Sequence, residues 1–259
     1  MSAPDRDPLR RPWRPLLIAV TFLTRVPVPP LGRIGERETG ASLVAYPVVG
    51  LLLGAVLLIV AAMTQPLPAL LQASLIVGAW VALTGALHID GLADTTDAWI
   101  GGAGSRERTL EIMKDPACGP VGVAAVVVML LVKTAAVAAL LETAWLAVPL
   151  AVVLGRCAVV ALFVTTPYVR AGGLGAALAE YAPRKPAAVV AALVAAGAVA
   201  LAGWPGAGGF ALAAAALIAV QHASARRLGG TTGDVAGASV EITETAALLG
   251  AAIVAVAMS

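Results

Sequence analysis

Long, nearly uninterrupted apolar runs dominate this 259-residue chain and restrict the folds open to it. A transmembrane helix needs roughly 17–25 predominantly apolar residues. Seven stretches meet or approach that length: 41–63, 69–89, 119–141, 144–166, 187–203, 208–223 and 236–258. Only 12% of the residues are charged, against about 25% in a soluble domain. The sequence therefore predicts an all-α, polytopic membrane protein with seven transmembrane helices.

An eighth apolar stretch, residues 15–30, is interrupted by Arg25 and three prolines. Proline removes a helical hydrogen bond, so we expect this stretch to lie at the interface or to re-enter the membrane rather than to cross it. The chain is predicted to form one domain, with a cytoplasmic or interfacial segment over 1–40 and a transmembrane bundle over 41–258. The Arg- and Pro-rich start has no apolar core typical of a signal peptide, so no removable leader is expected.

The basic residues outside these spans alternate from one side to the other. They occur before residue 41 and in the loops 90–118, 167–186 and 224–235. The connections 64–68, 142–143 and 204–207 and the C-terminus contain no Lys or Arg. By the positive-inside rule, the N-terminus is predicted to be cytoplasmic and the C-terminus to lie outside. The polar loops should then gather on one face.

The densest group of acids follows the second apolar stretch, in the sequence Leu-His-Ile-Asp-Gly-Leu-Ala-Asp-Thr-Thr-Asp-Ala-Trp. Three of the seven Asp in the chain lie here, as Asp90, Asp94 and Asp97. On a helix with 3.6 residues per turn they share one face, where they repel one another unless a cation or protons neutralise them. Carboxylates suit Mg²⁺, and Gly91 leaves room for a bulky ligand. We therefore predict a magnesium site.

The alternative interpretation is a solvated helix end whose acids cap the helix or pair with Arg106 and Arg108. An ordinary cap needs one Asp rather than three in register, which favours the cation site. His88, two residues before Asp90, is a candidate base or ligand. Its alternative role is that of a packed, hydrogen-bonded histidine.

Two glycine-containing loops are candidate phosphate sites. The first leads into Gly119-Pro-Val-Gly122, where backbone N–H groups near a helix N-terminus favour an anion and Lys and Arg are phosphate partners. Its candidate binding residues are Arg106, Arg108, Lys114, Asp115 and Gly119. The alternative is a plain juxtamembrane turn.

The second loop, residues 229–241, combines Gly and Thr with acids at the start of the last apolar stretch. Such a loop can cradle phosphate through backbone N–H groups, although it lacks the Lys-Ser or Lys-Thr pair of a Walker A loop. Gly233 and Glu241 join the substrate-binding candidates, and Asp234 joins the metal candidates. The alternative is a flexible loop with acids near the interface.

Two basic residues lie inside predicted spans. Arg156 is near the middle of its span, where an ionisable residue is costly and is usually paired or functional. It is a candidate substrate ligand, and its alternative role is an ion pair with an acid of the last span. Lys133 lies toward the outer end of its span and is predicted to extend to that surface.

Taken together, these motifs resemble the adenosylcobinamide-GDP ribazoletransferase family, also called cobalamin (5′-phosphate) synthase. The most specific block is His-Ile-Asp-Gly-Leu-Ala-Asp-Thr-Thr-Asp at residues 88–97. The other similar positions follow in order as 22–29, 46–50, 112–122, Lys133, Arg156 and 233–241. Residues 167–225 resemble the family in hydropathy alone.

The resemblance implies a Mg²⁺-dependent enzyme of the bacterial or archaeal cytoplasmic membrane. It would join adenosylcobinamide-GDP to the 5′-hydroxyl of α-ribazole, or of its phosphate form, and release GMP. The metal ligands would be Asp90, Asp94, Asp97 and Asp234, and the base would be Asp94, Asp97 or His88. The expected partners are these two substrates and the lipid bilayer. No nucleic-acid partner is expected, and the sequence leaves open whether the chain forms a homo-oligomer.

Two competing functions are open at this point. A CDP-alcohol phosphotransferase also has Asp-Gly within a helix, but there Ala-Arg and a later spaced Asp pair follow, whereas here Asp94 follows Ala93. A cation-coupled transporter would favour inverted repeats or acids near the bilayer midplane, whereas these acids collect at one face. The sequence also leaves open which carboxylate is the base, how many metals bind and by which route the corrinoid enters.

Overall fold

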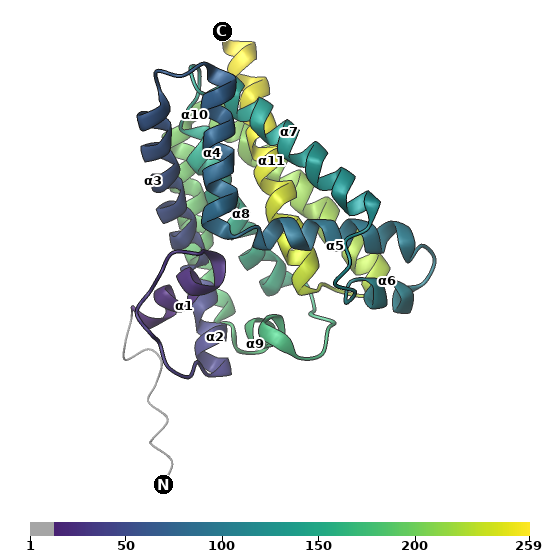
Figure 1. The fold of residues 1–259 in the computed structure, drawn as a ribbon. Coiled ribbons are helices and arrows are strands. Elements are labelled where there is room, and N and C mark those ends of the chain that lie inside the picture. Colours follow the sequence, from purple (N-terminus) through teal and green to yellow (C-terminus); the bar gives the residue numbers. More distant parts are fainter. Residues whose placement is uncertain (1–12) are drawn as a thin grey trace.

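The computed structural model describes residues 13–259, which form helices joined by loops. The predicted all-α fold is confirmed (Figure 1). The helices are α1 (Arg14–Leu23), α2 (Glu36–Ser42), α3 (Tyr46–Thr64), α4 (Ala69–Thr84), α5 (Leu87–Gly101), α6 (Arg106–Ile112), α7 (Pro120–Leu140), α8 (Ala147–Thr165), α9 (Gly173–Tyr181), α10 (Arg184–Leu228) and α11 (Gly233–Met258). Residues 1–12 of the predicted N-terminal segment lie outside the described residues.

Within the described part of the chain, five helical segments are long and apolar enough to cross a membrane. The bent pair α4 and α5 brings the number to six if it is one span. The 10-residue α1 is too short to span, as predicted for the stretch 15–30. The chain therefore has the helices of a polytopic membrane protein, and the count of seven spans stays a prediction.

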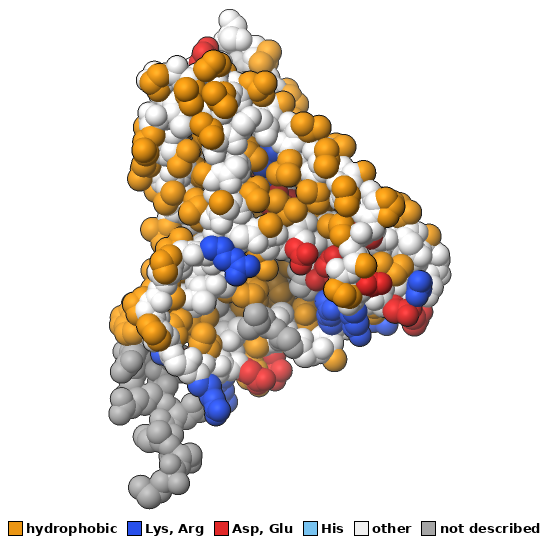
Figure 2. Space-filling view, in the orientation of Figure 1, with side chains coloured by type: hydrophobic (Ala, Val, Ile, Leu, Met, Phe, Trp, Pro, Cys, Tyr) orange, Lys and Arg blue, Asp and Glu red, His pale blue; other side chains and the backbone are white. Residues whose placement is uncertain are grey.

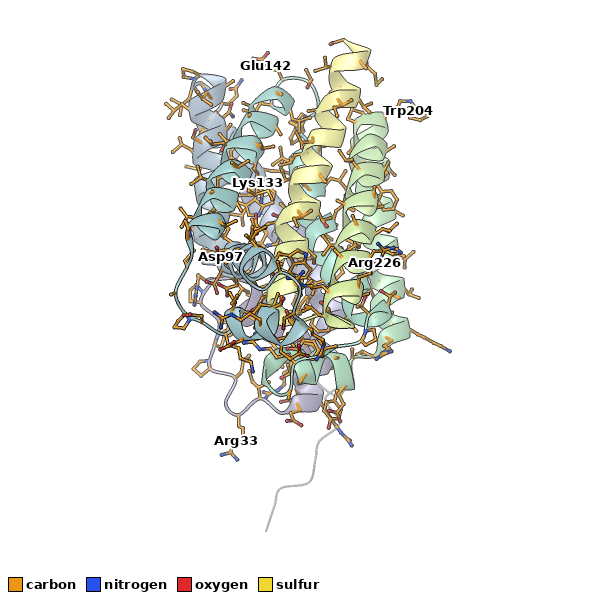
Figure 3. All side chains as sticks on the ribbon, turned by 90° about the vertical axis from the view of Figure 1, so that its right-hand side faces the viewer. Arg33, Asp97, Lys133, Glu142, Trp204 and Arg226 are labelled. Carbon is orange, nitrogen blue, oxygen red and sulfur yellow. The ribbon has the colours of Figure 1, made fainter. Side chains whose placement is uncertain are left out.

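Helix α10 accounts for the difference between the seven predicted spans and the five or six helical segments found. Its 45 residues would extend about 67 Å if straight, more than twice the hydrocarbon thickness of about 30 Å. The backbone leaves the helical region at Gly203 (φ 62°, ψ −146°), shortly before Pro205. In Figure 3, Trp204 lies at the same end of the bundle as Glu142, whereas Arg226 lies nearer the other end. Helix α10 is therefore a hairpin whose two arms match the predicted stretches 187–203 and 208–223.

Helix α8 forms the centre of the bundle, and glycines let its neighbours approach it closely. A Cβ atom on Gly50 of α3 would lie 3.0 Å from the Val153 Cα of α8, and one on Gly54 would lie 2.8 Å from the Pro149 Cβ. Small residues at helix interfaces are typical of packing in lipid, where close van der Waals contact replaces the hydrophobic effect. Gly155 of α8 permits the same close approach to α11, since a Cβ there would lie 2.7 Å from the Glu244 Cγ. Helices α3, α8 and α11 therefore pack closely and support the polar end of the bundle.

The loops that carry Lys and Arg gather at one end of the bundle, away from the C-terminus of α11 (Figure 1). The Arg106 Nε donates to the Leu228 carbonyl at 2.7 Å, and the Arg227 Nε donates to the Thr109 hydroxyl at 3.0 Å. Thr231 pairs with the loop after α8 through its backbone. The predicted gathering of the three loops on one face is confirmed, while its cytoplasmic orientation remains a prediction.

A sharp turn between α4 and α5 places α5 across this end of the bundle. The two helices meet at 88°, because Gly85 (φ 61°) and Ala86 (φ 57°) both adopt the left-handed conformation. Arg25 packs against the turn, and its backbone N–H donates to the Leu83 carbonyl at 2.7 Å. The second predicted span thus ends as a transmembrane helix near Thr84, and the Asp motif runs perpendicular to it.

We expect Gly85→Ala to lower the free energy of unfolding by about 1–2 kcal/mol, because an alanine at positive φ is strained. The new Cβ would also lie 2.1 Å from the Arg25 Nε. Gly78→Ala is the matched control, since a Cβ there meets no described heavy atom within 4 Å. Thermal unfolding of the detergent-solubilised variants measures both changes, and equal melting temperatures for the two would contradict the assigned turn geometry.

Candidate active site

Helix α5 and the start of α11 bring four carboxylates together at the polar end. The Asp94 carboxylate lies within electrostatic range of Asp90, Asp97 and Asp234. Helices α5 and α11 can approach so closely because Gly91 lacks a side chain: a Cβ there would lie 2.7 Å from the Asp234 carbonyl oxygen. Figure 2 shows acidic side chains beside a hollow on this face, with Lys and Arg side chains to either side. The shared face predicted for the acids thus becomes part of a larger acidic group.

Asp97 differs from the other acids because both of its oxygens are already hydrogen-bonded. They accept the backbone N–H groups of Gly119 (2.7 Å) and Gly122 (2.8 Å) at the start of α7. A Cβ atom on either glycine would lie 2.6 Å or less from an Asp97 oxygen, so only glycine permits this contact. The Gly119 N–H, which was predicted to bind phosphate, therefore donates to Asp97. Asp97 in this way caps the N-terminus of α7.

A cavity of about 280 Å³ lies beneath the acids, lined by α1, α3, α5, α8, α9, α11 and the loop between α8 and α9. Asp90, Asp234 and Arg170 line its polar side, and the Arg170 guanidinium donates to Asp234 at 2.7 Å. Gly233 also lines it, as expected of a residue near bound substrate. The deeper walls are apolar, with Leu23, Val159, Phe163 and Leu178 buried among them.

Arg170 and Tyr168 line this cavity but were not among the candidates from the sequence, since they lie in a stretch without a recognisable motif. Two backbone hydrogen bonds hold this loop against the loop before α11. The Val169 N–H donates to the Thr231 carbonyl at 2.9 Å, and the Thr231 N–H donates to the Pro167 carbonyl at 2.8 Å. The Tyr168 ring stacks on Phe163 with centroids 5.9 Å apart. Burial raises the pKa of the Tyr168 hydroxyl, so it stays protonated at neutral pH.

His88 lies on the buried side of α5 and lines the same cavity. Its side chain is only 4% exposed, and its Nδ1 has no hydrogen-bond partner among the described residues. A buried polar atom without a partner is costly and calls for a partner such as a water molecule, an ion or a ligand group. The prediction that His88 belongs to the site is therefore compatible with its position, while its role as base or ligand is open.

The basic residues predicted to bind phosphate lie on α6 and the loop after it, beyond the cavity. Arg106 donates to the Leu228 carbonyl, and Arg108 forms an exposed ion pair with Glu111 at 2.8 Å. The Asp115 carboxylate accepts the Ala117 N–H at 3.0 Å within its own turn, and Lys114 is exposed. Arg106 thus links α6 to the end of α10, and Arg108 pairs within α6. The alternative in which these arginines pair with the Asp motif is wrong.

A second ionic group is buried inside the bundle. Lys133 of α7 donates to Glu241 (2.6 Å) and to Glu244 (2.7 Å) of α11, and Arg156 of α8 donates to Glu244. The Lys133 ammonium also lies 4.5 Å from the Trp80 ring centroid. In Figure 3, Lys133 lies between Glu142 and Asp97 along the bundle. All four charged side chains are at most 5% exposed.

This network shows that one prediction is wrong. Lys133 points inward to two acids rather than to the outer surface, because an acid pair in a low-dielectric interior needs a cation. Arg156 forms the ion pair with the last span that was its alternative role, and Glu241 shares the same network. Neither Arg156 nor Glu241 is among the residues that line the cavity, and their roles in substrate binding stay predictions.

The fold and the site define an all-helical membrane protein with a carboxylate-rich cavity at one end of its bundle. Comparison with known proteins identifies the group within that class. The family model described as Cobalamin-5-phosphate synthase matches residues 15–252. The chain therefore belongs to the cobalamin-5-phosphate synthase family and is a transferase of cobalamin biosynthesis.

Individual relatives agree with the family match. The chain is 50% identical over 240 residues to the adenosylcobinamide-GDP ribazoletransferase of Stutzerimonas stutzeri (strain A1501), covering 92% of this chain and 98% of the relative. It is 48% identical over 236 residues to the enzyme of the same name from Pseudomonas savastanoi pv. phaseolicola (strain 1448A / Race 6), covering 91% and 97%. No solved structure matches the chain. The family resemblance seen in the motifs is confirmed, and it displaces the phospholipid-synthase and transporter alternatives.

Proposed function

We propose that this enzyme transfers the adenosylcobinamide phosphoryl group from adenosylcobinamide-GDP to a ribose hydroxyl of α-ribazole or of its 5′-phosphate. The 5′-hydroxyl expected from the family resemblance cannot be the acceptor for both substrates, because the 5′-phosphate form carries its phosphate on that oxygen. The acceptor oxygen bonds to the phosphorus that carries cobinamide, the bond from that phosphorus to the bridging oxygen breaks, and GMP leaves. The products are adenosylcobalamin, or its 5′-phosphate, and GMP. The observation that supports this most directly is the grouping of Asp90, Asp94 and Asp234 with Arg170 beside the cavity.

The donor set fits Mg²⁺. Asp90 is exposed and Asp94 partly exposed, whereas Asp97 has both oxygens bound to backbone N–H groups. Among the described residues, no three His, Cys, Asp or Glu side chains are close enough to hold a metal alone. Mg²⁺ commonly takes one or two carboxylates and completes its shell with waters and substrate phosphates, so two of the carboxylates Asp90, Asp94 and Asp234 would hold it together with the diphosphate. When bound, the ion would neutralise negative charge on the diphosphate and on the departing GMP.

The protein side chains supply positioning and proton transfer. Arg170 presents a planar guanidinium that suits phosphate oxygens, and it lies beside the carboxylates that would meet the diphosphate. Partial burial and the neighbouring carboxylates both favour the protonated form of Asp94. We therefore propose that Asp94 accepts the proton of the attacking hydroxyl. Asp97 positions the loop before α7 rather than touching the reacting atoms. We also assign the reaction to the cytoplasmic face, from the distribution of Lys and Arg.

Purified enzyme in lipid nanodiscs should release GMP and form the cobalamin product in equal amounts from adenosylcobinamide-GDP, α-ribazole and Mg²⁺. GMP release should stop when α-ribazole is omitted or when EDTA removes the metal, and added Mg²⁺ should restore it. Chromatography of the nucleotide and absorbance of the corrinoid follow both products. Failure of monodisperse protein to release GMP under these conditions would contradict the proposed reaction.

A further inference from the structure

We propose that the cavity is the binding site for the aromatic base of the acceptor nucleoside, and that the corrinoid donor stays outside it. This rests on the proposed function and specifies which of the two substrates the cavity takes. Three independent properties of the cavity support the assignment: its volume, its aromatic walls and a buried histidine nitrogen that has no hydrogen-bond partner among the described residues.

The volume restricts the ligand to something of nucleoside size. At about 280 Å³ the cavity lies near the lower limit of small-molecule pockets, which span about 300–1,000 Å³. A corrinoid macrocycle with its amide side chains is several times larger than a nucleoside. The donor can therefore reach the site only from outside, with its diphosphate near Asp90, Asp234 and Arg170 on the polar side.

Two stacked aromatic pairs contribute to the cavity walls. Phe22 of α1 and Tyr46 of α3 have ring centroids 6.3 Å apart at an interplanar angle of 29°. Phe163 of α8 and Tyr168 of the following loop have centroids 5.9 Å apart at 24°. All four residues line the cavity. Aromatic walls bind planar rings through stacking or edge contacts, so this lining suits a flat heterocyclic base.

The polar groups of the cavity distinguish a benzimidazole-type base from guanine. The Tyr46 and Tyr168 oxygens lie where they can accept hydrogen bonds from Ser42 and from the Gly233 backbone. The His88 Nδ1 is buried and has no partner within the described residues, and in the tautomer that protonates it this atom donates one hydrogen bond. The base of α-ribazole has one free ring nitrogen, which accepts one hydrogen bond.

Guanine would be a poor ligand for the same space. Its edge carries several donors and acceptors, and the deeper walls offer them Leu23, Val159 and Leu178. Buried polar groups left without partners cost free energy, so the cavity selects against the guanine of the donor. With the base inside, the ribose and its hydroxyl groups face Asp90 and Asp234.

The test compares Phe163→Leu and Phe22→Leu with Phe210→Leu, which lies in a separate apolar cavity between α8 and α10. Loss of a stacking ring costs about 1–3 kcal/mol, so we expect the KM for α-ribazole to rise about tenfold or more in the first two variants. The KM for adenosylcobinamide-GDP and kcat should stay within about twofold of the wild type. A rise in the KM for the donor instead, or no change in either KM, would overturn the assignment.

Equilibrium dialysis of labelled α-ribazole separates this proposal from the proposed function. Wild-type protein in nanodiscs should bind α-ribazole, unlabelled α-ribazole should compete and guanosine should not, and Phe22→Leu should weaken binding about tenfold. If the wild type binds α-ribazole in this way but releases no GMP, the base site stands and the proposed reaction fails. If the wild type turns over but Phe22→Leu and Phe163→Leu bind α-ribazole normally, the reaction stands and the base site fails.

Discussion

Replacement of Asp90 or Asp94 by Asn should lower turnover by about a hundredfold to a thousandfold, the loss seen when one preorganised electrostatic group is removed from an active site. Asn keeps the size of the side chain but removes the negative charge that would hold Mg²⁺ beside the diphosphate. Asp90 is exposed and Asp94 partly exposed, and neutralising either relieves repulsion among the acids. Membrane insertion should therefore not change, and the melting temperature should not fall. GMP release by protein of verified monodispersity measures the effect.

Two further variants make this result specific. Glu142→Gln neutralises an exposed acid at the opposite end of the bundle (Figure 3) and should leave turnover unchanged. Asp97→Asn keeps only one acceptor oxygen for two backbone donors, so it should reduce stability as well as activity. Wild-type turnover in both Asp90→Asn and Asp94→Asn would remove these carboxylates from the site.

Neutralising a single member of the buried ion network should destabilise the protein strongly. Glu244→Gln leaves two cations with one acid, and Arg156→Met leaves two acids with one cation. An uncompensated buried charge costs about 3–5 kcal/mol. The double variant Arg156→Met/Glu244→Gln retains the Lys133–Glu241 pair with no net charge, so it should be more stable than either single variant.

The exposed pair Arg108–Glu111 provides the matched control for this cycle. Surface ion pairs contribute about 0–1 kcal/mol, so Arg108→Met and Glu111→Gln should have small, nearly additive effects. Melting temperatures in detergent, followed by size-exclusion chromatography after heating, measure all the variants. A double Arg156/Glu244 variant that is less stable than both single variants would show that charge balance does not govern this network.

The sequence predicted the parts of the structure that depend on local pattern. Apolar runs located the long helices. The alternation of Lys and Arg predicted which loops meet at one end. Both patterns follow from the free energy of placing residues in lipid or in water. The common face of Asp90, Asp94 and Asp97 followed from helical periodicity. The left-handed turn at Gly85 and Ala86 was missed, since a single Gly between two apolar segments has no distinctive pattern.

The pairing of charges could not be predicted, because partners lie far apart along the chain. Arg170 contacts Asp234 across 64 positions, and no motif surrounds it. Lys133 was assigned to the nearer surface by its depth in one helix, whereas its orientation depends on the acids of another. Asp97 resembled its neighbours in sequence, and only its contact with the start of α7 distinguishes it from them.

The ion network also bears on how the chain is assembled during synthesis. Lys133 precedes Glu241 by 108 residues, and Arg156 precedes Glu244 by 88. Helices α7 and α8 therefore leave the ribosome carrying cations whose counter-charges have not yet been made. The charges of this network balance only when α11, which is translated after both helices, packs beside them, and the same helix carries Asp234. Completion of the membrane core and completion of the carboxylate group are thus one biosynthetic event.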